Sequence, residues 1–149
     1  MVVGVEKLEE VMYGIIRRVP GVSRTQLVKL AYLIDRESYV QNGKTLTRIK
    51  YEMYFYGPYC SEFEDALSDL KSKDIIIEDF DGMSYQIYPN KEMDYHLSSE
   101  ERKIVSERVK FAKNEGLMRS AAAIKRHVYS LPEVDQAEPF KPINFKLIE

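Results

Sequence analysis

Residues 24–41 form the stretch that most restricts the fold of this chain. Drawn as a helix, the stretch is apolar over most of its circumference, through the side chains Leu27, Val28, Leu30, Ala31, Tyr32, Leu33 and Ile34. Such a helix has to be covered by neighbours on several sides. Ser23 and Gln26 have the spacing of a capping box, which predicts the helix start, and Asn42-Gly43 is typical of a helix end. The other elements are therefore expected to pack around this central helix.

Four further helices are predicted by apolar residues that recur at helical spacing. They cover residues 5–19, about 62–70, 100–113 and 117–129. Pro20-Gly21 is expected to end the first of them. Ser61 is expected to cap the second, and Ser98 with Glu101 has the form of another capping box. The chain is thus expected to be mostly helical.

An aromatic strand is predicted over residues 51–56, where side chains alternate between two faces. The face expected to point to the core carries Tyr51, Met53 and Phe55. The other face carries Tyr54 and Tyr56, and whether the last two helices cover it stays open. Gly57-Pro58 is expected to end the strand.

A β-hairpin is predicted over residues 75–88, because two strand-like segments flank Asp81-Gly82. The order helix, helix, strand, helix, hairpin is that of a winged helix. We therefore expect a single domain over residues 1–149, of the α+β class: a mostly helical, winged-helix-like domain with a small antiparallel β-hairpin or sheet and extra C-terminal helices. Prolines at positions 132, 139 and 142 predict an extended C-terminal arm over about residues 131–149.

Composition and motifs argue against several classes of function. The single Cys60 cannot form an internal disulfide, and with His96 and His127 it falls short of the four ligands of a structural zinc site. The sequence has no Walker A loop, GxGxxG, GxSxG or HExxH motif, so we expect no catalysis, metal or cofactor. It has no run of eighteen apolar residues and no basic-apolar leader, which predicts a cytoplasmic protein without membrane contact.

Polar side chains on the central helix form a first candidate binding site. Lys29, Tyr32 and Arg36 lie along one face at helical spacing, with Asp35 beside Arg36. One interpretation is a partly exposed ion pair between Asp35 and Arg36, worth about 0.2 to 1 kcal/mol. The other is that these side chains receive a ligand or a partner.

Tyrosines form a second candidate site. The chain has eleven tyrosines and no tryptophan, and Tyr54, Tyr56 and Tyr59 cluster around Gly57-Pro58. Tyrosine combines a large apolar body with a polar tip, so it serves both half-buried cores and interfaces. If the last two helices leave this face open, we expect it to be the partner surface; if they cover it, the tyrosines belong to the core.

A winged helix can also bind DNA, and charge bears on that alternative. The net charge of the chain is −2, and residues 61–100, which include the helix and hairpin that would face DNA, hold three Lys or Arg against eleven Asp or Glu. Affinity for DNA depends on neutralising phosphates, so contact through this face is disfavoured. Contact through basic residues elsewhere stays open, with the candidates Arg17, Arg18, Arg24, Lys44, Arg48 and Lys50.

Several of these segments together resemble one family, the Panacea domain or SocA-like antitoxin family. Its order and spacing are matched by KLAYLIDR at 29–36, GKTLT at 43–47, Tyr51, and YGPY at 56–59. The resemblance extends over about residues 27–88. The positions that match the family pattern are Lys29, Tyr32, Asp35, Gly57 and Pro58.

The resemblance implies a non-catalytic domain. Members of this family neutralise a toxin encoded beside them by direct binding, or hand it to a protease as an adaptor. We therefore predict binding to a protein partner, with contacts at Lys29, Tyr32, Asp35, Arg36, Tyr54, Tyr56, Gly57, Pro58 and Tyr59. The alternative is a winged-helix transcriptional regulator, a homodimer through its C-terminal elements, that holds DNA by the six basic residues named above.

Overall fold

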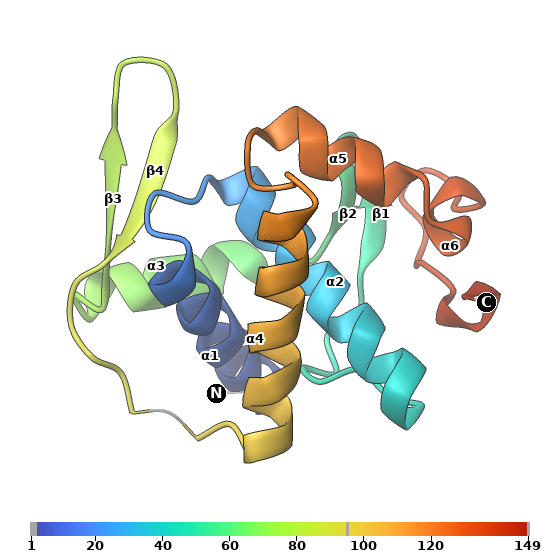
Figure 1. The fold of residues 1–149 in the computed structure, drawn as a ribbon, viewed down its shortest axis with the longest axis horizontal. Coiled ribbons are helices and arrows are strands. Elements are labelled where there is room, and N and C mark those ends of the chain that lie inside the picture. The colour runs from blue at the N-terminus through green and yellow to red at the C-terminus, as the bar shows by residue number, and fades with distance from the viewer. Residues whose placement is uncertain (1–2, 95, 149) are drawn as a thin grey trace.

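A central helix and two separate β-hairpins organise the α+β fold of this protein (Figure 1). The computed structural model describes residues 3–94 and 96–148. Its helices are α1 (Val3–Arg18), α2 (Arg24–Asn42), α3 (Phe63–Ser72), α4 (Ser99–Asn114), α5 (Ala121–Tyr129) and the short α6 (Pro132–Asp135). Its strands are β1 (Glu52–Tyr54), β2 (Gly57–Tyr59), β3 (Ile76–Phe80) and β4 (Tyr85–Pro89), and a 3-10 turn, η1 (Phe145–Leu147), follows α6. The predicted α+β class is confirmed.

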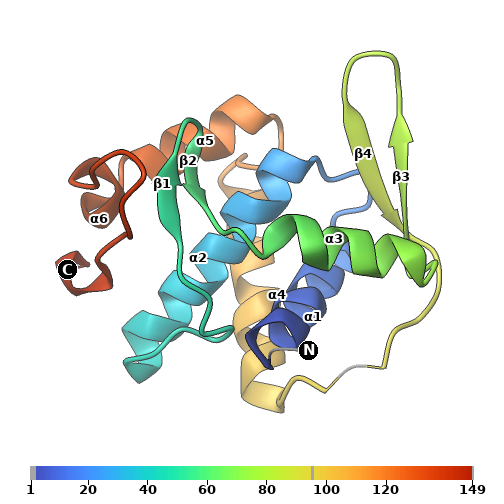
Figure 2. The same cartoon turned by 180° about the vertical axis from the view of Figure 1, so that it is seen from behind.

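Helix α2 is buried on several sides. It packs against α1, α4, α5 and β2, and Figures 1 and 2 show it between α4 and the β1–β2 hairpin. Leu27 and Leu30 are fully buried. Ser23 forms the predicted capping box with Gln26, and Gly43 ends the helix in the left-handed conformation with a φ of 76°. The prediction of a central, covered helix is confirmed.

Two helix starts differ from the predictions. Helix α3 follows Glu62, and Ser61 does not cap it, because the Ser61 hydroxyl donates instead to the Glu62 side chain at 3.2 Å. Helix α5 begins later than predicted, after the capping residue Ser120. The reason is Gly116, whose φ of 74° turns the chain after α4, so that a loop separates the two helices.

The four strands form two separate antiparallel hairpins. In the β3–β4 hairpin, Asp81 Oδ1 accepts hydrogen bonds from the backbone of Met83 and Ser84 at 2.9 Å, which confirms the predicted Asp-Gly turn. Val22 forms a β-bridge with Ile87 of β4, and the hairpin stands out from the helices in Figure 1. Because β1 pairs with β2 and not with this hairpin, the winged-helix likeness stays a prediction.

The C-terminal segment lies along β1 and is not extended throughout, contrary to the prediction. It starts with α6, where Pro132 stands in the first turn, a position that needs no backbone N–H. The backbone N–H groups of Phe140 and Ile143 then donate to the carbonyls of Met53 and Tyr51 at 2.7 and 2.9 Å. The segment therefore holds the β1–β2 hairpin from its outer side.

Candidate functional site

The β1–β2 hairpin carries the tyrosines predicted to bind a partner. Its register pairs Tyr54 with Gly57, so Phe55 and Tyr56 form the turn. Tyr51 is buried as predicted, whereas Phe55 is 78% exposed and does not belong to the core. The prediction for Phe55 was wrong because Gly57, with a φ of 103°, lets the chain turn back into a second strand where an end was expected.

Four exposed rings gather at this turn, and we call them the aromatic tip: Tyr54, Phe55, Tyr56 and Phe140. Their exposed fractions are 37%, 78%, 66% and 52%, in that order. The Phe140 ring centroid lies 5.8 Å from that of Tyr54 and 5.1 Å from that of Phe55. Helix α5 reaches one edge, where Lys125 Nζ lies 4.9 Å from the Tyr56 ring centroid. The C-terminal helices therefore leave much of this face uncovered.

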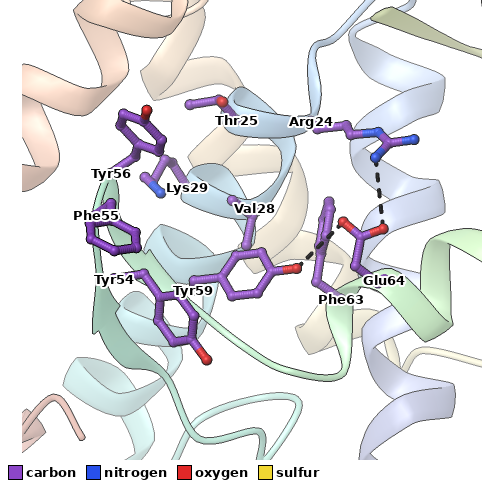
Figure 3. A pocket seen from close by; sticks show the side chains of 11 residues that line it. Arg24, Thr25, Val28, Lys29, Tyr54, Phe55, Tyr56, Tyr59, Phe63 and Glu64 are labelled. Atoms are coloured by element: carbon purple, nitrogen blue, oxygen red, sulfur yellow. Dashed lines mark hydrogen bonds and ion pairs between the residues drawn. The ribbon is translucent and has the colours of Figure 1, made fainter. Parts of the chain in front are cut away.

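A cavity of about 220 Å³ lies beside the aromatic tip, between the start of α2, the hairpin and the start of α3. Figure 3 shows its walls, which are mostly apolar and aromatic. At one end Glu64 accepts a hydrogen bond from the Tyr59 hydroxyl at 3.4 Å and lies 3.7 Å from Arg24. Tyr59 is thus part of the cavity wall.

Lys29 lines this cavity from α2 and is only 3% exposed. Its ammonium donates to the Pro58 carbonyl at 3.1 Å. A Cβ at Gly57 would lie 3.1 Å from Lys29 Cε, so the hairpin backbone passes close over the lysine stem. Burial, and after it the charge of Lys125, lowers the pKa of Lys29 to about 8. Lys29 thus ties α2 to β2 and places a charge in an apolar setting.

Tyr32 and Arg36 both bind Glu133 of α6. The Tyr32 hydroxyl donates to Glu133 Oε2 at 2.5 Å, and Arg36 Nε donates to the same oxygen at 2.7 Å. Tyr32 and Glu133 are both fully buried. Burial first, and then the hydrogen bond to Glu133, raises the pKa of Tyr32. The interpretation of an ion pair between Asp35 and Arg36 is therefore wrong, because Arg36 pairs with Glu133.

Asp35 is a fully buried carboxylate that holds the segment after α2. Its Oδ1 accepts from the Thr47 backbone N–H at 2.8 Å. Its Oδ2 accepts from the Thr47 hydroxyl at 2.6 Å and from the Tyr51 hydroxyl at 2.8 Å. Burial raises the pKa of Asp35 to about 6, although these hydrogen bonds act in the opposite direction. Asp35 fixes the entry into β1 relative to α2.

The residues predicted to bind a partner therefore fall into two sets. Tyr54, Tyr56, Gly57 and Tyr59 line the cavity beside the hairpin, together with Lys29. Tyr32 and Asp35 are enclosed and hold other segments in place, and Arg36 binds the same Glu133 as Tyr32. The Pro58 carbonyl accepts the hydrogen bond from Lys29. A contact between any of these residues and a partner stays a prediction.

The six basic residues considered for DNA lie at opposite ends of α2. The helix has 19 residues and is therefore about 28 Å long. Arg17, Arg18 and Arg24 flank its start, whereas Lys44, Arg48 and Lys50 follow its end. Arg24 is also paired, with its Nε 2.6 Å from Glu78 Oε2. DNA binding through these residues stays a prediction.

A metal site and a membrane-spanning helix were looked for in the part of the chain that the structure describes. No group of three His, Cys, Asp or Glu there could hold a metal ion. None of its helices has both the length and the hydrophobicity of a membrane-spanning segment. Cys60 is buried, and burial raises the pKa of its thiol to about 12. The cytoplasmic location stays a prediction.

Three residues of this region were not predicted from the sequence. Phe140 belongs to the aromatic tip, Phe55 is exposed on it, and Glu133 binds the central helix. The local signals are Pro132, which is common in the first turn of a helix, and Glu133 after it, because an acidic side chain is favourable near a helix start. Such signals could have placed a short helix around Glu133, although they could not have named the partners Tyr32 and Arg36.

Comparisons with known proteins bear on the same segments. The family model described as "Antitoxin SocA-like, Panacea domain" matches residues 27–126. Comparisons with curated proteins and with solved structures gave no significant match. The matched range runs from α2 into α5 and includes Lys29, Asp35 and the β1–β2 hairpin, in agreement with the resemblance stated above. This chain therefore belongs to the SocA-like antitoxin family, which is defined by the Panacea domain.

Proposed function

We propose that this protein binds a partner protein through the aromatic tip and neutralises that partner, a toxin, by direct contact. The observation that carries the proposal is the exposure of four aromatic rings on one part of the surface, where Phe140 packs against both Tyr54 and Phe55. Exposed apolar patches of this kind mark interaction sites. Tyrosine and phenylalanine are also enriched at interface centres, where a few buried rings supply most of the binding energy.

The tip of the β3–β4 hairpin is the rival surface. Phe80, Met83 and Tyr85 are 58%, 92% and 49% exposed. Acidic residues stand beside these side chains in sequence, among them Asp79 and Asp81, and charged residues are depleted at interface cores. The aromatic tip, by contrast, joins rings from two distant segments and borders an apolar cavity. We therefore assign the partner contact to the aromatic tip.

The test is capture of the partner by the tagged full chain from its native lysate, at moderate salt and with nuclease present. We expect one stoichiometric protein that arrests growth when produced alone and is harmless when produced together with this chain. The double variant Phe55→Ser/Tyr56→Ser should lose both capture and rescue, because it removes the two most exposed rings of the tip.

A matched control is the double variant Phe80→Ser/Met83→Ser, which removes apolar surface from the other hairpin. This control should keep both capture and rescue. If instead the control loses the partner and the Phe55→Ser/Tyr56→Ser variant keeps it, the proposal is wrong. If no protein is captured, and a parallel capture without nuclease recovers nucleic acid in a salt-sensitive manner, the transcriptional regulator is favoured instead.

A further inference from the structure

The cavity beside the aromatic tip has room for one large side chain. Its volume is about 220 Å³, which equals roughly seven waters at their liquid volume. Val28, Tyr59 and Phe63 line it, and its outer rim carries Phe55 and Tyr56. Figure 3 shows Phe55 and Tyr56 on the hairpin side of this space and Phe63 on its α3 side. An apolar or aromatic side chain of a partner would therefore fit it by size and chemistry.

Lys29 adds a positive charge to this apolar cavity. An ammonium group has three N–H donors, and the Pro58 carbonyl takes one of them. Among the described residues, no ion pair involves Lys29. Burying an ammonium without a counter-charge is costly, and that cost agrees with the lowered pKa of Lys29. The Lys29 ammonium thus has N–H donors without an acceptor, and a positive charge without a carboxylate partner, among the described residues.

The other charged groups at this cavity differ from Lys29. Arg24 pairs with Glu78 at 2.6 Å and with Glu64 at 3.7 Å, so its charge is already matched. Lys125 lies outside, against the ring of Tyr56. A ligand that enters the cavity would therefore meet one unmatched charge on its wall, and that charge is positive.

We propose that this cavity receives the C-terminal residue of the partner protein, with an apolar side chain against the aromatic walls and the terminal carboxylate on Lys29. A C-terminal residue presents both chemistries within the volume of one residue, which is what the cavity offers. Capture of a terminal carboxylate by protein N–H donors is an established mode of peptide recognition. This inference rests on the proposed function, because it places part of the partner beside the aromatic tip.

The experiment compares two probes that differ only in the carboxylate, N-acetylphenylalanine and N-acetylphenylalaninamide. Each is titrated into the isotope-labelled full chain and followed by NMR. We expect the acid to bind about ten-fold tighter than the amide, because a hydrogen bond to a charged group is worth more than a neutral one. The shifted backbone signals should include Val28, Lys29 and Tyr59. Equal binding of the two probes would overturn the inference without the need for any variant.

Two lysine variants make the assignment specific. Lys29→Met keeps the apolar stem and removes the charge, so the preference for the acid should disappear. Lys125→Met removes the neighbouring lysine and should keep the preference. Circular dichroism should show that both variants are folded. Lys29→Met is expected to fold because it removes a buried charge that lacks a counter-charge, and Lys125 lies outside the cavity. Persistence of the preference in Lys29→Met would overturn the inference.

A third probe tests the source of the carboxylate. N-acetylglutamate α-amide carries the acid on a side chain and has no aromatic ring. It should bind more weakly than N-acetylphenylalanine, and tighter binding would overturn the assignment to a C-terminal residue. If the probes show no acid preference while the Phe55→Ser/Tyr56→Ser variant loses the partner, this inference fails and the proposed function stands. If that variant keeps the partner, the proposed function fails whatever the probes show.

Discussion

Among single residues, Glu9 on α1 is a buried carboxyl group whose pKa is raised. It is 3% exposed. Burial is the main cause that raises the pKa of Glu9 to about 7, followed by a hydrogen bond with Asp69 and the negative charge of Asp69. The positive charge of Lys73 lowers this pKa, and the negative charge of Glu6 raises it slightly. Lys73 pairs with Asp69 at 2.9 Å, which keeps Asp69 ionised. Glu9 is therefore the member of the pair that holds the proton.

This pKa predicts how stability depends on pH. The ordinary pKa of Glu9 is 4.5 and its folded value is about 7. Between these values the folded state keeps a proton that the unfolded state has lost, so stability falls as pH rises from about 4.5 to about 7 and stays reduced above. Glu9→Gln mimics the protonated form. We expect it to raise the free energy of unfolding by about 1 to 2 kcal/mol at pH 8.

Urea unfolding at pH 4.5 and at pH 8 measures this effect. The gain from Glu9→Gln should be present at pH 8 and small at pH 4.5, where wild-type Glu9 is protonated in the folded state and half protonated in the unfolded state. Glu107→Gln, on the exposed side of α4, removes the same charge and should change stability by less than about 0.5 kcal/mol at either pH. A gain from Glu9→Gln that is equal at both pH values would contradict the assignment.

Among the elements, the C-terminal segment depends on one buried contact. Glu133 is fully buried in α6 and accepts hydrogen bonds from Tyr32 and Arg36 of α2. The segment then runs along β1 and brings Phe140 to the aromatic tip. Loss of the Glu133 carboxylate would leave a buried hydroxyl and a half-buried guanidinium without their partner.

Glu133→Ala should therefore destabilise the protein by about 3 kcal/mol, because breaking a buried ion pair leaves its other member unmatched. Hydrogen exchange should also become faster at the Met53 and Ile143 amides, which bond across the C-terminal segment and β1. Glu138→Ala, at an exposed position of the same segment, is the matched control and should change neither quantity. Unchanged exchange in Glu133→Ala would show that α6 does not anchor the segment.

For the whole molecule, the distribution of charge bears on the partner. Residues 61–100, which include α3 and the β3–β4 hairpin, hold three Lys or Arg against eleven Asp or Glu. Two of the basic residues near this acidic block, Arg24 and Lys71, already pair with Glu78 at 2.6 and 2.9 Å. The basic residues Lys44 and Arg48 line one cavity beyond the other end of α2. Together with Arg17, Arg18 and Lys50, they stay predicted candidates for DNA contact.

We predict that the full chain binds random duplex DNA with a dissociation constant weaker than about 10⁻⁵ M at physiological salt, the range of non-specific contacts. Fluorescence anisotropy over a series of salt concentrations measures it. Tight binding with a steep salt dependence would support the regulator instead. Lys44→Glu/Arg48→Glu should then abolish it, whereas Lys110→Glu/Lys113→Glu on α4 should reduce it less.

Local features of this protein could be read from its sequence. The caps Ser23 and Ser98, the stop at Gly43 and the turn at Asp81 were all predicted and are present. Each depends on contacts between residues a few positions apart, so the sequence contains all that is needed. The buried surface of α2 was also predicted, because apolar residues surround it. By itself the sequence therefore determined helices α1 to α5 to within a few residues, the β3–β4 hairpin and the family, but not the short α6.

Tertiary structure alone decided how the site is assembled. Arg36 pairs with Glu133, a residue 97 positions away, and not with the neighbouring Asp35. Phe140 completes the aromatic tip from the far end of the chain. Lys29 is enclosed because Gly57 lets the hairpin pass over it. Contacts of this kind depend on which distant segments pack together when the chain folds around α2. The periodicity and spacing of residues in a single sequence do not determine which segments these are.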